Sequence, residues 1–173
     1  MSGDEISRQL QEHHESAFGW ALGCCAQDAA EAEEILQTVY LKILQGRARY
    51  SGKAAFKTWL FAVIRKTAAD ARRRRIVHDF HLSTFRQHLE ENAIAEAPDA
   101  CIDAADQQAA LRRLLARLPA RQREVLHLVF YHELTLQQAA GVMGVSVGAV
   151  RKHYDRGKKR MRQLLEECEM AEG

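Results

Sequence analysis

The fold is decided by the stretch Leu134–Arg162, "LTLQQAAGVMGVSVGAVRKHYDRGKKRMR". Thr135 has the side chain of a helix N-cap, and it is followed at helical spacing by Leu136, Ala139, Ala140 and Met143. Gly144 suits the left-handed turn that ends such a helix, and Ser146 suits the cap of the next one. Two helices joined by a tight glycine turn are typical of a helix-turn-helix, although an ordinary helical hairpin has much the same pattern.

The second helix of this pair begins with small residues and then becomes strongly basic. Val147, Val150 and Tyr154 share one face at spacings of three and four, so we expect them to pack inward. The outward positions would let the backbone approach DNA closely and let long bases reach base edges and phosphates. The outward set comprises Gly148, Ala149, Arg151, Lys152, His153 and Arg156.

The net charge of +2 conceals alternating blocks of charge along the chain. Residues 1–46 carry eight acids and two bases, whereas residues 47–75 carry one acid and ten bases. Residues 79–106 carry seven acids and one base, residues 111–163 three acids and twelve bases, and residues 164–173 four acids. Two basic blocks on patterned helices indicate two contacts with a polyanion, since clustered Lys and Arg release counterions from a phosphate backbone.

Helical periodicity organises the remaining sequence. Residues 6–25 form one apolar stripe, and Asp28 is placed to cap a helix that carries Ile35, Leu36, Val39, Tyr40 and Ile43. A loop with two glycines precedes a third helix, in which Trp59 is expected in the core and which ends in four arginines, Arg72–Arg75. Pro119 suits the first turn of the helix that leads into the helix-turn-helix.

These patterns predict an all-α fold with two small helical domains joined by a linker. Only two prolines and few alternating apolar runs leave little room for β-sheet. We predict an N-terminal domain over residues 1–78, an acidic linker over 79–106, and a C-terminal domain with the helix-turn-helix over 107–173. Pro98 and the loss of periodicity mark the linker.

The sequence also predicts where the protein acts. No stretch approaches the roughly 20 apolar residues of a membrane span, and the polar start lacks the features of a signal peptide. We therefore expect a cytoplasmic protein without membrane insertion. The four cysteines have no CxxC spacing, so we expect buried or inert thiols rather than a disulfide framework or a metal site.

The same residues leave two other functions to consider. A metal enzyme in a helical bundle would draw on His13, His14 and Glu15, or on His78 and His81, but such sites need carboxylate and histidine ligands that recur at matched depths on several helices. We therefore expect neither enzymatic activity nor a cofactor. A stand-alone helix-turn-helix regulator with an N-terminal dimerisation or sensing bundle is the closer alternative, yet it has no need of the first basic block.

Residues 118–165, from "LPARQREVLHLVFYHELTLQQAAGVMG" onward, resemble the fourth conserved region of bacterial RNA polymerase sigma factors. The segments "AEEILQTVYLKIL" and "FKTWLFAVIRKTAADARRRR" resemble the second conserved region. A short linker between the two regions is similar to the small extracytoplasmic-function group of sigma factors. The resemblance implies a protein that binds core RNA polymerase and directs promoter-specific initiation of transcription.

The resemblance also implies a role for each site. The polymerase-binding helix would present Glu34, Leu36, Gln37 and Tyr40. Contacts to the minus-ten element would come from Arg49, Tyr50, Lys53, Lys66, Asp70 and Arg73, with the Tyr50 ring stacking on an unpaired base. Contacts to the minus-thirty-five element would come from Ser146, Gly148, Arg151, Lys152, His153 and Arg156. Core RNA polymerase, promoter DNA and an anti-sigma factor are the partners that it implies, whereas the promoter sequence and the inducing signal are not encoded in any recognisable pattern.

Overall fold

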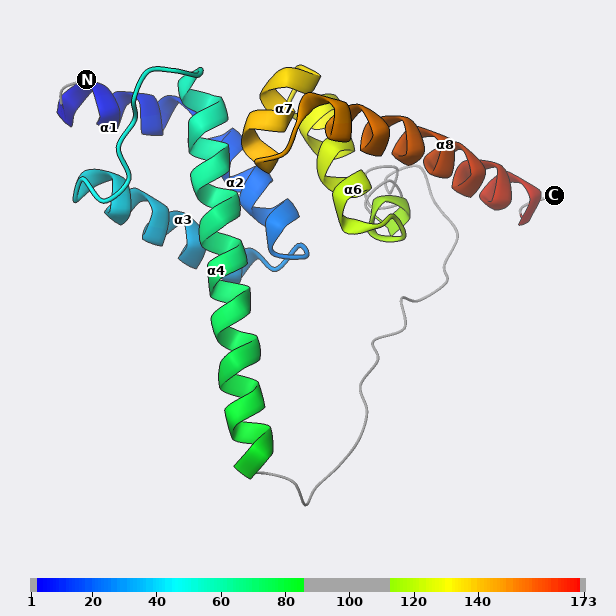
Figure 1. Cartoon of the computed structure of the whole chain (residues 1–173), viewed down its shortest axis with the longest axis horizontal. Helices are drawn as coiled ribbons and strands as arrows, with labels where there is room; N and C mark the ends of the chain where they lie inside the picture. The colour runs from blue at the N-terminus through cyan, green and yellow to red at the C-terminus, as the bar shows by residue number, and fades with distance from the viewer. Residues whose placement is uncertain (1–2, 86–112, 172–173) are drawn as a thin grey trace.

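The computed structural model describes residues 3–85 and 113–171, and both segments consist of helices joined by turns and loops (Figure 1). The N-terminal unit contains α1 (Gly3–Glu12), α2 (His14–Cys24), α3 (Ala29–Leu44) and α4 (Phe56–Phe85). The C-terminal unit contains a helical turn at residues 113–116, α6 (Ala120–Leu126), the π-helix η2 (His127–Tyr131), α7 (Leu136–Met143) and α8 (Val147–Ala171). The prediction of an all-α fold with two helical units is confirmed.

The predicted helix caps are present in both helical units. The Asp28 side chain accepts a hydrogen bond from the Glu31 backbone N–H at 2.9 Å and so caps α3. At α7, Thr135 and Gln138 form a reciprocal capping box, and Gly144 ends the helix with φ of +66°. Ser146 Oγ accepts a hydrogen bond from the Ala149 N–H at 3.2 Å, which satisfies one free donor at the start of α8.

Two boundaries differ from the prediction. The N-terminal apolar stripe is divided between α1 and α2 by a break at His13. The helix α4 continues to Phe85, past the domain boundary predicted after residue 78 and into the segment predicted as a partly helical linker, because residues 79–85 contain no Gly or Pro to stop a helix. The acidic linker positions Glu90, Glu91, Glu96, Asp99, Asp103 and Asp106 lie outside the described residues.

The two units pack against each other through a shared hydrophobic core. Trp20 of α2 and Phe61 of α4 are 1% and 0% exposed, and they belong to the same buried cluster as Val125 and Leu128 of the C-terminal unit. A smaller cluster, consisting of Leu114, Leu118, Leu126 and Leu164, lies within the C-terminal unit. We call the contact between the two units the seam.

The arrangement in Figure 1 places α7 beside the N-terminal part of α4. A Cβ atom added to Gly141 of α7 would lie 3.5 Å from the Thr58 methyl group, so the two helices are in close contact there. From α7 the chain enters α8, which runs away from the N-terminal unit, while the C-terminal half of α4 extends past the other helices (Figure 1). The helix-turn-helix is therefore attached to the N-terminal unit through its first helix.

The backbone at Gly144 supplies a test of this local fold. Replacement of Gly144 by Ala should lower the free energy of unfolding by about 1–2 kcal/mol, because a side chain disfavours the left-handed conformation. No heavy atom lies within 4 Å of a Cβ built there, so steric contact adds nothing. Urea denaturation followed by circular dichroism measures the change.

Gly148→Ala is the matched control, since Gly148 also has open space around it but lies inside α8 without a positive φ. This variant should be neutral or more stable by up to about 1 kcal/mol. Equal destabilisation by both substitutions would contradict the conformational explanation.

Candidate nucleic-acid and polymerase interfaces

The start of α8 presents an open, basic surface. Ser146, Gly148, Arg151, Lys152 and Arg156 are exposed, and His153 is half-buried. No heavy atom lies within 4 Å of a Cβ built on Gly148, so another molecule can approach the backbone closely at this point. The structure therefore brings all six residues that were predicted for the minus-thirty-five element onto one short stretch of helix.

One of the predicted inward residues of α8 is not inward. Val150 is fully buried, whereas Val147 is 37% exposed, because the first turn of α8 extends past the part of the helix that packs on α7. Tyr154 is half-buried: its ring stacks on that of exposed Phe130 with centroids 5.9 Å apart, and Lys158 Nζ lies 4.3 Å from the Tyr154 centroid. The prediction that Val147 packs inward was wrong.

The loop before α4 holds an aromatic cluster. The Tyr50 ring lies 5.3 Å from the rings of both Phe56 and Trp59, and its hydroxyl donates to the Ala54 carbonyl. Tyr50 is half-buried in this cluster, while Arg49 and Lys53 on either side of it are exposed. Half-buried Trp59 packs on the same cluster, as was expected of a core residue. The loop thus presents a fixed ring between two cations.

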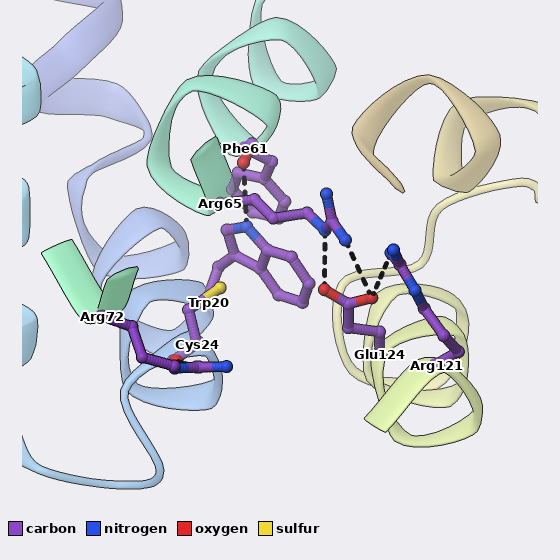
Figure 2. Close-up of polar contacts among 7 residues, drawn as sticks. All are labelled: Trp20, Cys24, Phe61, Arg65, Arg72, Arg121 and Glu124. Carbon is purple, nitrogen blue, oxygen red and sulfur yellow. Dashed lines mark hydrogen bonds and ion pairs between the residues drawn. The ribbon is translucent and has the colours of Figure 1, made fainter. Parts of the chain in front are cut away.

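Of the four consecutive arginines on α4, two are bound within the protein and two are exposed to solvent. Arg72 donates to the Cys24 carbonyl at 2.8 Å, and Arg75 forms an ion pair with Glu31 at 2.9 Å (Figure 2 shows the first contact). Arg73 and Arg74 are exposed. Lys66 is also exposed and Asp70 is half-buried on the same helix, so these residues form the accessible polar surface of α4.

The exposed face of α3 differs from the predicted polymerase-binding set. Glu34 and Gln37 are exposed, and half-buried Tyr40 has its hydroxyl 3.0 Å from His14 Nδ1. Leu36 is only 4% exposed. Its side chain belongs to the core of the N-terminal unit, so the prediction that Leu36 contacts another protein was wrong.

Two residues of α3 were missed in the sequence. Leu41 and Leu44 are 55% and 61% exposed, and with Glu34 and Gln37 they follow one another at helical spacing on the outside of the helix. Their signal was present in the sequence, because both fall outside the buried stripe of Ile35, Val39 and Ile43. We call Glu34, Gln37, Leu41 and Leu44 the α3 face.

The seam contains polar contacts that the sequence did not predict. Arg65 of α4 and Glu124 of α6 form an ion pair at 2.6 Å, and Glu124 also pairs with Arg121 at 3.3 Å (Figure 2). Beside the seam, within the N-terminal unit, the Trp20 indole N–H donates to the Phe61 carbonyl at 3.0 Å (Figure 2). Because Arg65 and Glu124 are both largely covered, this ion pair is less screened by solvent than one on the open surface.

The cysteines of α2 are protected thiols. Burial raises the pKa of Cys25 to about 11, and burial together with the nearby Glu124 carboxylate raises the pKa of Cys24 well above its usual range. Both thiols therefore stay protonated and poorly nucleophilic near neutral pH. Cys101 lies outside the described residues.

Residues 3–85 and 113–171 contain no group of three or more His, Cys, Asp or Glu side chains arranged to hold a metal ion. Within the same residues, no helix combines the length and the apolar character that crossing a membrane requires.

Together these features define a helical DNA-binding protein that has a helix-turn-helix and a second basic unit. Comparison with known families gives a more specific result. Residues 10–76 match the family model described as Sigma-70 region 2, and residues 108–161 match the model described as Sigma-70, region 4. The chain therefore belongs to the sigma-70 family, within the extracytoplasmic-function group.

Individual proteins agree with this assignment. The chain is 29% identical to RNA polymerase sigma factor CarQ of Myxococcus xanthus, over 83% of this chain and 80% of that protein. It is 28% identical to ECF RNA polymerase sigma factor SigX of Bacillus subtilis, over 81% of this chain and 73% of that protein.

Solved structures show the same fold. The sigma factor RpoE of Bartonella quintana, solved with the anti-sigma factor NepR, matches with a TM-score of 0.70 and 21% identity, over 94% of this chain and 97% of that chain. CnrH, solved with the cytosolic domain of CnrY, matches with a TM-score of 0.67 and 18% identity, over 96% and 90% of the two chains.

The protein is thus an RNA polymerase sigma factor: it binds core polymerase and promoter DNA, directs the initiation of transcription, and is not itself an enzyme. The match of the N-terminal unit to region 2 excludes the stand-alone regulator that the sequence had left as an alternative.

Proposed function

We propose that the start of α8 reads the minus-thirty-five element and that the loop before α4, with the exposed side of α4, contacts the minus-ten element. The observation that carries this proposal is the open first turn of α8, where small residues precede Arg151, Lys152 and Arg156. Long donors one turn into a helix can reach base edges in the major groove while the N-terminal amides face phosphate. We assign Ser146, Gly148 and His153 to the same contact.

The minus-ten contact is proposed for Arg49, Tyr50, Lys53, Lys66, Asp70 and Arg73. Support comes from the exposed cations and from the position of Tyr50, whose ring is held by Phe56 and Trp59 before any DNA arrives. A ring that is already ordered loses little conformational freedom when a base stacks on it. Arg74, which is also exposed, is added to this surface. Arg72 and Arg75 are left out, because their contacts with the Cys24 carbonyl and the Glu31 carboxylate lie within the protein.

We further propose that the α3 face binds core polymerase and that half-buried Tyr40 lies at its edge. Two exposed leucines beside a carboxylate and an amide provide the mixture of apolar anchor and polar rim that protein interfaces use.

An anti-sigma factor is a proposed partner as well, since RpoE of Bartonella quintana, which has the same fold, was solved with the anti-sigma factor NepR. We propose the cytoplasm as the compartment, because core polymerase acts there.

Polymerase docking is tested by truncation of the α3 face. The double variant Gln37→Ala and Leu41→Ala should weaken binding to core polymerase by about tenfold, because both side chains are exposed and contribute little to the core. A titration of labelled sigma factor with core enzyme measures the affinity. Leu165→Ala, at an exposed leucine of α8, is the matched control and should leave the affinity unchanged. Equal affinities for the double variant and the wild type would remove the α3 face from the interface.

Base reading by α8 is tested by Arg151→Ala in a reconstituted holoenzyme. Arg151 should contribute about 1–3 kcal/mol of discrimination between minus-thirty-five variants, as expected of a directed contact to a base. Lys159→Ala is the control: Lys159 is exposed two turns further along α8, so its loss should weaken all variants by a similar factor. Run-off transcription from a panel of promoter variants measures the discrimination between variants and the overall loss of activity for each substitution. If Arg151→Ala also weakened every variant equally, Arg151 would be a phosphate contact and another outward residue would read the bases.

A further inference from the structure

The seam holds the two DNA-binding surfaces too close together for a promoter. Arg73 lies 15 residues after Thr58 on α4, or about 22 Å along the helix axis. Ser146 lies five residues after Gly141, which contacts Thr58, and five residues span at most about 17 Å. With the separation between Thr58 and Gly141 added, Arg73 and Ser146 are within about 50 Å of each other, whereas elements about 25 base pairs apart are separated by about 85 Å of DNA at roughly 3.4 Å per base pair.

The closed arrangement must therefore open before the chain can contact both promoter elements, a conclusion that rests on the proposed DNA contacts. Opening separates Trp20 and Phe61 from the C-terminal unit and breaks the ion pair between Arg65 and Glu124. It also breaks the hydrogen bond that Lys57 Nζ donates to the His132 carbonyl at 3.0 Å.

The side chain of His132 is buried, at 3% exposure. Its ring lies 4.7 Å from that of Phe61 and 5.9 Å from that of Trp20, so the N-terminal unit supplies much of its cover. A Cβ atom on Gly19 would lie 3.7 Å from His132 Cε1, which extends this contact along α2. The buried Nε2 atom has no hydrogen-bond partner among the described residues.

The groups that face His132 do not compensate a positive charge. From α2 come Trp20 and Gly19, from α4 come Phe61 and the Lys57 ammonium, and from η2 come His127 and Tyr131. Lys57 is a cation, and the Glu124 carboxylate of α6 is occupied by Arg65 and Arg121. The closed seam accepts a neutral imidazole and disfavours an imidazolium, which requires water or an anion.

We propose that His132 is a proton-operated latch: while neutral it holds the two units of the sigma factor together, and when protonated it releases them. The chain would then be held closed near neutral and alkaline pH and become competent to span a promoter on acidification. Core polymerase and acid would act on the same equilibrium, since both favour the open chain.

The direction of the pH effect follows from the environment of His132. Burial, followed by the charges of His127 and Lys57, lowers the pKa of His132 to about 3 in the closed chain. In the open chain an exposed histidine has a pKa of about 6.5. Above pH 6.5 the preference for the closed state has its full value. As the pH falls from 6.5 toward 3, the ratio of closed to open chains decreases about tenfold per pH unit.

The test measures opening in the free chain, so its result does not depend on the proposed DNA or polymerase contacts. Fluorescent dyes are attached through unnatural amino acids at Ala30 and Ala120, two exposed positions on either side of the seam. Single-molecule energy transfer then gives the ratio of open to closed chains. Between pH 7.5 and pH 5.5 this ratio should rise about tenfold in the wild type. An Arg65→Ala background, which lacks the ion pair across the seam, brings the ratio into the measurable range if open chains are rare.

His132→Phe keeps an aromatic ring at the seam but cannot be protonated, so its open-to-closed ratio should stay constant over the same pH range. His132→Leu is the second neutral variant, and far-UV circular dichroism identifies which of the two retains native helicity. His78→Gln, at an exposed histidine of α4, is the control and should respond to pH as the wild type does. A wild-type ratio that is constant with pH would overturn the proposal, as would an unchanged pH response in the neutral variants.

Discussion

The indole of Trp20 joins the two halves of this sigma factor. It is buried to 1% exposure, donates its N–H to the Phe61 carbonyl and stacks on the Phe61 ring at 5.7 Å. Its ring also lies 5.6 Å from His127 and 5.9 Å from His132 of the C-terminal unit. One side chain of α2 thus fixes α4 within the N-terminal unit and contributes to the surface on which the helix-turn-helix unit packs.

Polar contacts inside the protein determine which basic residues are available for DNA. Arg65, Arg72, Arg75 and Lys57 belong to the basic blocks of the sequence, yet each is bound by a carboxylate or a carbonyl inside the protein. The exposed bases are concentrated at the loop before α4, on the outside of α4, and along α8. Part of the positive charge therefore holds the closed fold together, and the remainder is presented to solvent. Opening of the seam would release Arg65 and Lys57 as well.

Local features were predictable from the sequence because they depend on neighbours along the chain. Asp28, Thr135 and Gly144 each satisfy or end a helix through contacts within about four residues, and the structure confirms all three. The seam was not predictable, since helical periodicity indicates which face of a helix is buried but not which other helix buries it. The predictions for Leu36 and Val147 failed because each rested on a sequence pattern alone. The motif match assigned Leu36 to a surface contact, although its side chain is buried. The helical spacing assigned Val147 to the core, although the first turn of α8 leaves it exposed.

The central claim is that the closed chain cannot initiate transcription until the two units separate. A disulfide across the seam tests it most directly, because a Cβ atom built on Gly141 would lie 3.5 Å from the Thr58 methyl carbon, which puts the two Cβ atoms within about 5 Å of each other, close to the roughly 3.5–4.5 Å that a disulfide spans. The variant with Thr58→Cys and Gly141→Cys is oxidised, and promoter-specific run-off transcription is measured with core polymerase before and after reduction, beside the two single variants. The account predicts that the oxidised double variant loses at least about nine-tenths of its activity and that reduction restores it, whereas full activity with the disulfide quantitatively formed would contradict it.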